Sequence, residues 1–183
     1  MLMTPGRNRT PLKKSTLLLA ALIAAGAGLP APGQTGGQAP SVQGLLRLGG
    51  PELEALYRQG RAVGIPPGRV RGTAILAPGA RRNEVMALGT RMVWQGKVFE
   101  SGNTTAVNRF FGLPVVRANV YQAQSLHDGA AALVLDYSQT SRVYARYRDE
   151  IREVAPGLFL GLMYDVTTSP PHLRMYFALE SHP

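Results

Sequence analysis

Cysteine is absent from this 183-residue chain. Neither a disulfide framework nor a thiolate metal centre can form, so a hydrophobic core must stabilise the domain. Histidine is scarce as well, because only His127, His172 and His182 occur and none has a second histidine two or four residues away. The sequence accordingly predicts no metal site and no cofactor.

The patterns of common catalytic classes are missing too. No Gly-x-Ser-x-Gly segment occurs, and Ser125, His127 and Asp128 lie too close together in one loop to form a triad. Val98 follows Lys97 where a phosphate-binding loop requires serine or threonine. The sequence therefore assigns no enzyme class, and an enzymatic function is the less favoured interpretation.

The N-terminal segment has no acidic residue and contains the three parts of a secretory signal peptide. Four basic residues (Arg7, Arg9, Lys13 and Lys14) precede an apolar run over residues 17–25, and Ala25-Gly26-Ala27 then offers a cleavage site. The run is too short for a membrane-spanning helix, which needs about 20 residues. We expect residues 1–27 to be removed, with a second possible cut near Ala31. The mature protein would be exported, to the periplasm or beyond, without a stable membrane span.

Much of the positive charge belongs to this segment. The chain has 20 Lys and Arg against 11 Asp and Glu, a formal charge of +9. Cleavage after Ala27 removes four cations and no acid, which leaves 16 cations, 11 acids and a charge of +5. This is too little for the dense basic surface that nucleic-acid binding requires, so no nucleic-acid partner is expected.

The remaining chain divides into a flexible leader over residues 28–50, rich in Pro, Gly and Gln, and one domain over residues 51–183. Pro51 at a first helical position, acids after it and Gly60 at the end predict a short helix over residues 51–60. The spacing of Val85 and Leu88 predicts a second one over residues 82–88.

Strand-sized runs fill the rest of the domain. They cover residues 69–77, 92–100, 104–111, 115–124, 131–138, 158–166 and 172–179, and turn residues such as Asp128-Gly129 and Pro156-Gly157 separate them. This spacing is typical of an antiparallel sandwich or barrel. Residues 141–154 fit either a helix or a strand. We favour a turn or helical piece up to about Tyr147, followed by a strand over residues 148–154 that pairs across Pro156-Gly157.

Three strings resemble a family of uncharacterised bacterial proteins that are similar to lipocalin-like, calycin-type barrels. They are WQGKVF at residues 94–99, LDYS at residues 135–138 and RDEIREVAPGL at residues 148–158. The first is also similar to small domains named for a Gly-x-Trp-x-Gly motif, although Met92 replaces the first glycine. The resemblance implies a mainly β fold, namely an antiparallel up-and-down β-barrel (lipocalin-like) with one or two short N-terminal helices. It also implies ligand binding, but no reaction.

Charged residues interrupt two of the predicted strands. Asp136 follows an apolar run, and the segment around Ile151 alternates Arg148, Glu150 and Arg152 with Asp149 and Glu153. One interpretation is a set of cross-strand ion pairs on a solvated face or barrel rim. Another is an interior polar floor, with Arg148 or Arg152 facing a ligand carboxylate and Asp136 orienting it. A third is an acid/base pair of Asp136 and Glu150.

Aromatic residues on different predicted strands either fill the core or line one cavity. The resulting candidate ligand-binding set is Trp94, Tyr121, Asp136, Tyr137, Arg148, Arg152 and Tyr164. We expect an exported barrel that binds a small apolar or amphipathic molecule. The alternatives are a structural or envelope-associated protein without a ligand, and an enzyme that uses the cluster of Asp136, Arg148 and Glu150.

Overall fold

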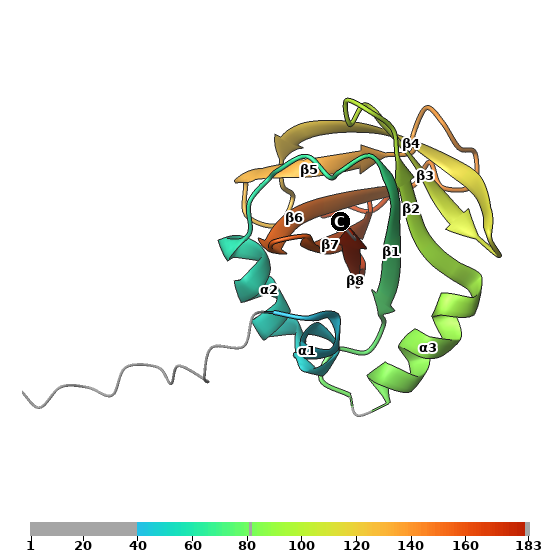
Figure 1. The fold of residues 1–183 in the computed structure, drawn as a ribbon. Coiled ribbons are helices and arrows are strands. Elements are labelled where there is room, and N and C mark those ends of the chain that lie inside the picture. The colour runs from blue at the N-terminus through green and yellow to red at the C-terminus, as the bar shows by residue number, and fades with distance from the viewer. Residues whose placement is uncertain (1–39, 81, 182–183) are drawn as a thin grey trace, which may run out of the picture. The chain divides into compact units, whose positions relative to one another are not determined.

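The computed structural model describes residues 40–80 and 82–181, in which eight antiparallel strands form a closed barrel (Figure 1). Each strand pairs with the next one along the chain, and the first pairs with the last. The predicted fold class, an up-and-down β-barrel with short N-terminal helices, is therefore confirmed. The expected signal peptide and the expected leader up to residue 39 lie outside the described residues.

The strands are numbered in chain order. They are β1 (Gly68–Ile75), β2 (Trp94–Phe99), β3 (Thr105–Phe110), β4 (Leu113–Gln124), β5 (Ala131–Asp136), β6 (Tyr147–Ala155), β7 (Leu158–Asp165) and β8 (His172–Ser181). Pairing of β1 with β8 closes the barrel, with a register that runs from Val70 opposite Ser181 to Ile75 opposite Tyr176. Closure leaves no unpaired edge among these eight strands of the described segments.

The ambiguous segment of residues 141–154 folds as expected. A turn region precedes β6, and β6 then pairs with β7 across the tight turn, with Ala155 opposite Leu158. Gly157 in this turn has a φ of +71°, a conformation that glycine adopts without strain. From Tyr147 onward, the segment therefore forms the strand that its alternating charged residues predict, and not the helix that the spacing of its apolar residues would also allow.

Within the described residues, three helices accompany the barrel: α1 (Val42–Arg47), α2 (Gly50–Gln59) and α3 (Asn83–Val93). Helix α2 matches its prediction, and α3 continues five residues beyond the predicted end at residue 88. Helix α1 lies inside the segment predicted as a leader, which is a correction to residues 42–47. The Ser41 hydroxyl accepts a hydrogen bond from the Gly44 amide, and Leu45 and Leu46 are buried, so this end of the segment is ordered by capping and packing.

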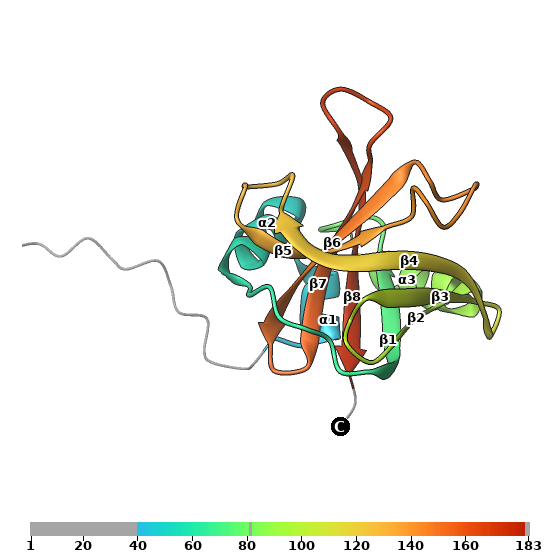
Figure 2. The ribbon, with the colours of Figure 1, turned by 90° about the horizontal axis from the view of Figure 1, so that it is seen from above.

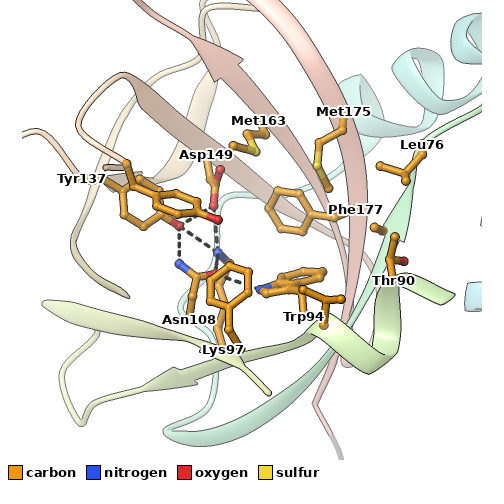
Figure 3. Close-up of a pocket in the computed structure, with 14 residues that line it drawn as sticks. Leu76, Thr90, Trp94, Lys97, Asn108, Tyr137, Asp149, Met163, Met175 and Phe177 are labelled. Atoms are coloured by element: carbon orange, nitrogen blue, oxygen red, sulfur yellow. Dashed lines mark hydrogen bonds and ion pairs between the residues drawn. The ribbon is translucent and has the colours of Figure 1, made fainter. Parts of the chain in front are cut away.

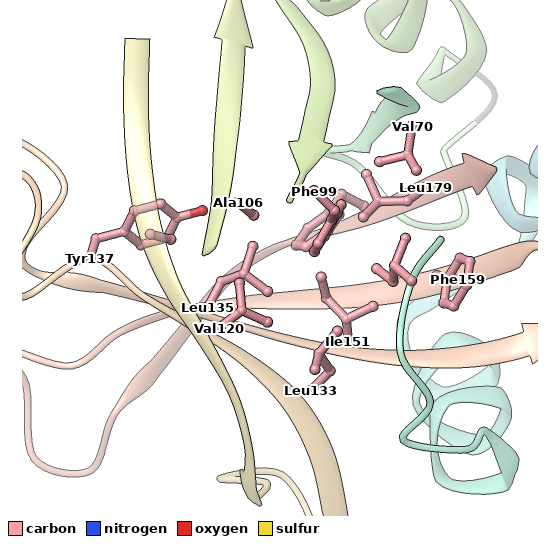
Figure 4. Close-up of a cluster of buried hydrophobic side chains, with 13 residues drawn as sticks. Val70, Phe99, Ala106, Val120, Leu133, Leu135, Tyr137, Ile151, Phe159 and Leu179 are labelled. Atoms are coloured by element: carbon pink, nitrogen blue, oxygen red, sulfur yellow. The ribbon is translucent and has the colours of Figure 1, made fainter. Parts of the chain in front are cut away.

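Two hydrophobic cores lie on opposite sides of the barrel wall. The inner core fills one part of the barrel, with Val70, Phe99, Leu135 and Ile151 among its members (Figure 4). The outer core packs α1 and α2 against β7, β8 and the end of β1, through residues such as Leu53 and Leu160. Alternate residues of one strand serve the two cores, because successive side chains point to opposite faces.

A buried asparagine fixes the position of α3. The Nδ2 atom of Asn83 donates to the Leu46 carbonyl at 2.9 Å, and its Oδ1 atom accepts from the Ala77 amide at 3.3 Å. The start of α3 is thereby tied to α1 and to the segment that follows β1. Within the described part of the chain, no helix combines the length and apolar character needed to cross a membrane.

Candidate functional site: a polar floor in an apolar barrel cavity

The barrel interior contains a cavity of about 300 Å³ between the inner core and α3 (Figure 3). Its walls are mostly apolar, and its lining residues are Ala74, Leu76, Thr90, Val93, Trp94, Lys97, Asn108, Phe110, Tyr137, Tyr144, Asp149, Met163, Met175 and Phe177. Leu76 and Val93 line the cavity and are also exposed to solvent, which places its opening beside α3.

An ion pair forms the floor of this cavity. The Nζ atom of Lys97 lies 2.8 Å from Oδ2 of Asp149, and both side chains are buried. The same ammonium group donates to Oδ1 of Asn108 at 2.7 Å and to the Tyr137 hydroxyl at 2.9 Å. All three donors of the ammonium group are therefore satisfied within the barrel.

Tyr137 and Asn108 complete the network. The Tyr137 hydroxyl donates to Oδ2 of Asp149 at 2.7 Å and accepts from Nδ2 of Asn108 at 2.8 Å. Trp94 joins it through its indole Nε1, which donates to Oδ1 of Asn108 at 3.0 Å. Among the residues that the structure describes, Oδ1 of Asp149 has no hydrogen-bond partner, so one acceptor remains at the cavity floor.

Burial dominates the electrostatics of the floor. It lowers the pKa of Lys97, and the neighbouring Asp149 carboxylate opposes that shift. Burial and the same carboxylate hold the pKa of the Tyr137 hydroxyl well above its usual range, so Tyr137 stays protonated and donates. As an ammonium–carboxylate ion pair, Lys97 and Asp149 together carry no net charge.

A β-bulge brings Trp94 and Lys97 to the same wall. Residues three apart in a regular strand point to opposite faces. In β2, however, Trp94 pairs with Phe110 and Lys97 with Asn108, so β2 spans three residues where β3 spans two. Gly96, with a φ of +105°, lies within this bulge. A Cβ atom at this position would collide with the backbone of β1, so only glycine fits.

Two further glycines make room for the aromatic wall of the cavity. A Cβ atom on Gly72 would lie 2.6 Å from Cη2 of Trp94, and one on Gly161 would overlap the ring of Phe177. The two rings pack edge to face with centroids 5.7 Å apart. The rings of Trp94 and Phe177 therefore occupy space that a side chain at Gly72 or Gly161 would fill.

The structure brings two of the seven predicted ligand-binding residues to the cavity, Trp94 and Tyr137. Tyr121 and Asp136 lie on the outer surface, where the Tyr121 hydroxyl donates to Oδ2 of Asp136 at 3.2 Å. Arg148 lies on the outer face of β6, and its Nη2 atom donates to the Gln124 carbonyl at 2.6 Å. Asp136 thus has neither of its two predicted arginine partners within hydrogen-bond distance.

Arg152 and Tyr164 are buried, but beneath α2 rather than inside the barrel. Arg152 binds both carboxylate oxygens of Asp128 at 2.7 Å and lies over the Tyr57 ring. Tyr164 belongs to the outer core. The expected interior floor of Arg148 or Arg152 is therefore corrected, because the opposite face of β6 turns inward and presents Asp149.

Glu150, the second member of the predicted acid/base pair, is also buried on the outer side of β6. Its carboxylate accepts from the Ser125 hydroxyl at 2.5 Å and from the Leu126 amide at 2.9 Å. This carboxylate fixes the loop that follows β4 and does not contact Asp136.

The sequence analysis did not identify Lys97 and Asn108 as site residues. The available signal was Lys97 itself, a lone lysine among the apolar residues of a predicted strand.

In the described part of the chain, no group of three His, Asp or Glu side chains lies close enough together to hold a metal ion.

No known protein family matches the sequence, and no curated protein matches it. The fold is similar to that of a solved structure described as a protein from Thermomonospora curvata. The match has 19% sequence identity and a TM-score of 0.47, and it covers 73% of this chain and 88% of the other.

Proposed function

We propose that this protein binds a small, uncharged amphipathic molecule in the cavity of the barrel. The observation that carries the proposal is the buried Lys97–Asp149 pair at the floor of an otherwise apolar cavity. Eight-stranded barrels are just wide enough to be filled by side chains or to hold one small ligand. Here the inner core fills one part and leaves the other hollow.

The polar floor supports a binding role over a purely structural one. Replacing a buried ion pair by apolar residues of similar volume is often neutral or stabilising, so a barrel that only needs a core has no use for one. Ligand binding explains the polar floor, because a few convergent polar groups in an apolar pocket fix the orientation of the molecule that binds there.

The floor also indicates the chemistry of the ligand. Because Lys97 and Asp149 carry no net charge together, the cavity offers no compensation for a charged ligand. The free Oδ1 atom of Asp149 requires a hydrogen-bond donor, such as a hydroxyl group. The rings of Trp94 and Phe177 and the side chains of Met163 and Met175 suit an apolar body. A volume of about 300 Å³ is at the small end of ligand pockets.

Intrinsic fluorescence tests this directly, because Trp94 is the only tryptophan of the chain and lines the cavity. The probes are 1-octanol, its methyl ether and octanoate, which share an apolar chain and differ in the head group. We expect octanol to change the fluorescence at the lowest concentration, the ether to bind more weakly and octanoate most weakly. Preferential binding of octanoate would contradict the assignment of the floor.

Two variants and a mass measurement complete the test. Met175→Phe narrows the cavity and should weaken octanol binding, whereas Val166→Phe, on an exposed loop residue, should not. Native mass spectrometry of the purified protein would show any molecule retained from the producing cell. A bare protein mass, together with no response to any probe, would favour the structural alternative.

The N-terminal sequence motivates the further proposal that the protein acts after export.

A further inference from the structure

Four arginines surround a second hollow, on the outer side of the barrel. Arg69 and Arg71 of β1, Arg91 of α3 and Arg109 of β3 line a groove of about 350 Å³, together with Gln95 and the backbone of β1. We call it the arginine groove. Within the described residues, none of its four guanidinium groups has a carboxylate within ion-pair distance.

Other arginines of the protein do have acidic partners, among them Arg61 with Glu153 and Arg117 with Glu100. Like charges placed together repel one another, and an anion relieves this repulsion. Guanidinium groups bind the oxygens of phosphate through paired hydrogen bonds. The arginine groove is therefore suited to phosphate groups.

An apolar helix face lies next to this groove. Val85, Leu88 and Met92 follow one another at helical spacing on α3 and are 73%, 67% and 76% exposed. A surface helix normally turns such a stripe toward the core. In α3 the buried positions are instead Asn83 and Ala87, so the apolar stripe faces outward. Exposed apolar stripes of this kind mark interaction surfaces.

The turn between β3 and β4 extends the apolar face. Its Phe111 amide donates to the Val93 carbonyl at 2.9 Å, which places the turn at the end of α3, as Figures 1 and 2 both show. Phe111 is 72% exposed and has a φ of +50°, where Asn or Gly is the ordinary choice. A strained, exposed phenylalanine is costly for folding and useful for insertion into an apolar medium. Arg109 of the groove donates to the Gly112 carbonyl of the same turn.

We propose that α3 and the β3–β4 turn dock on the surface of a bilayer that contains anionic phospholipid. The exposed apolar side chains enter the boundary between head groups and acyl chains, and the arginine groove binds lipid phosphates beside them. A helix face and a turn tip project outward, which suits a deformable lipid surface. The opening of the cavity, at Leu76 and Val93, adjoins this surface, so an amphipathic ligand would enter from the bilayer without crossing water.

Vesicle sedimentation tests the docking surface. The vesicles consist of phosphatidylcholine alone or with phosphatidylglycerol added. The full chain is compared with a form that begins at Gln38, where the compact unit of the barrel begins, so that any contribution of residues 1–37 is separated. We expect both forms to bind the anionic vesicles preferentially, with binding weakened by added salt.

Matched variants locate the binding. Arg71→Gln with Arg91→Gln should weaken anionic-vesicle binding about tenfold or more, since a basic residue near such a surface is worth roughly 1 kcal/mol. The control is Arg58→Gln with Arg117→Gln, which has the same charge change outside the groove and should lose much less. Leu88→Ser should weaken binding, whereas Leu126→Ser, on an exposed residue of the loop after β4, should not.

The proposal would be overturned by equal binding to both vesicle types, by equal losses in the groove and control variants, or by a dimer in solution that Leu88→Ser dissociates. Tight binding of inorganic phosphate without recruitment to vesicles would also overturn it, because the groove would then serve a soluble anion. Met175→Phe, which narrows the cavity, should leave vesicle binding unchanged, so the docking surface and the ligand cavity are tested independently.

Discussion

Lys97 of β2 and Asp149 of β6 form an ion pair of 2.8 Å inside the barrel, although they come from strands that are not neighbours in the sheet. Three side-chain hydrogen bonds join them to Tyr137, which directly follows β5, and to Asn108 of β3. The pair therefore connects opposite parts of the barrel wall through its interior, at the height where the inner core ends and the cavity begins.

Removal of one partner of this pair should destabilise the protein strongly. Lys97→Met leaves the Asp149 carboxylate buried without a cation and should cost about 3–5 kcal/mol. The double variant with Asp149→Asn should recover part of the loss, because no unpaired charge remains. Urea unfolding at neutral pH measures both. Arg117→Met breaks an exposed pair and serves as the control, with an expected loss of about 0–1 kcal/mol.

A glycine of the cavity wall should not tolerate a methyl group. Gly161→Ala places a Cβ atom against the Phe177 ring, so the ring must move into the cavity, with an expected cost of about 1–3 kcal/mol. Octanol binding, followed by Trp94 fluorescence, should weaken in the same variant. Gly89→Ala, in the open flank of α3, should instead stabilise the protein by about 1 kcal/mol. An unchanged stability of Gly161→Ala would mean that Phe177 has room elsewhere.

The Arg152–Asp128 contact should contribute to stability in a pH-dependent way. Hydrogen bonds from Arg152 lower the pKa of the Asp128 carboxyl below its unfolded value of 3.8. The stabilisation is therefore fully present above that value and is lost as the pH falls through the folded pKa. Asp128→Asn should make the stability of the protein depend less on pH below about pH 4 than in the wild type. Parallel acid dependences for the two proteins would contradict the prediction.

The structure lowers the expected cost of Asp136→Asn, because Asp136 does not form a buried ion pair with an arginine. It lies on the outer surface, where it accepts from Tyr121 and from the Ser138 amide. Asp136→Asn should therefore cost about 1 kcal/mol or less in urea unfolding, within the range of an exposed polar contact. A loss of several kcal/mol would indicate a buried partner that this geometry does not contain.

Export remains a prediction of the N-terminal sequence. The basic segment, the apolar run of residues 17–25 and Ala25-Gly26-Ala27 predict cleavage, so N-terminal sequencing of the exported protein should begin near Gly28. Recovery of intact Met1 in a soluble cytoplasmic fraction would contradict this.

The fold was largely predictable from the sequence because turn residues and strand-length runs have a local cause. Pro156-Gly157 fixes the β6–β7 turn, and the alternation around Ile151 fixes a strand, whatever lies elsewhere in the chain. Helix α1 was missed because its six residues owe their order to packing against distant strands. Short segments of this kind have little helical tendency of their own.

The site was less predictable, because it depends on which face of each strand turns inward. Along β6, charged residues occupy both faces, and the sequence alone does not decide between Asp149 and Arg152 for the interior. The helix α2 and the 125–130 loop decide it by covering the Arg152 side with partners such as Asp128. Lys97 was hidden by the bulge at Gly96, since a regular strand would place it opposite to Trp94.

The bulge in β2 makes the site depend on a backbone irregularity rather than on side chains alone. Trp94 and Lys97 are three residues apart, so only the extra residue of the bulge keeps the indole and the ammonium group on one wall. Deletion of Gln95 would place them two apart, and a regular strand would then keep both side chains inside the barrel. A change that made β2 regular without a deletion would instead turn one of the two side chains to the outer face.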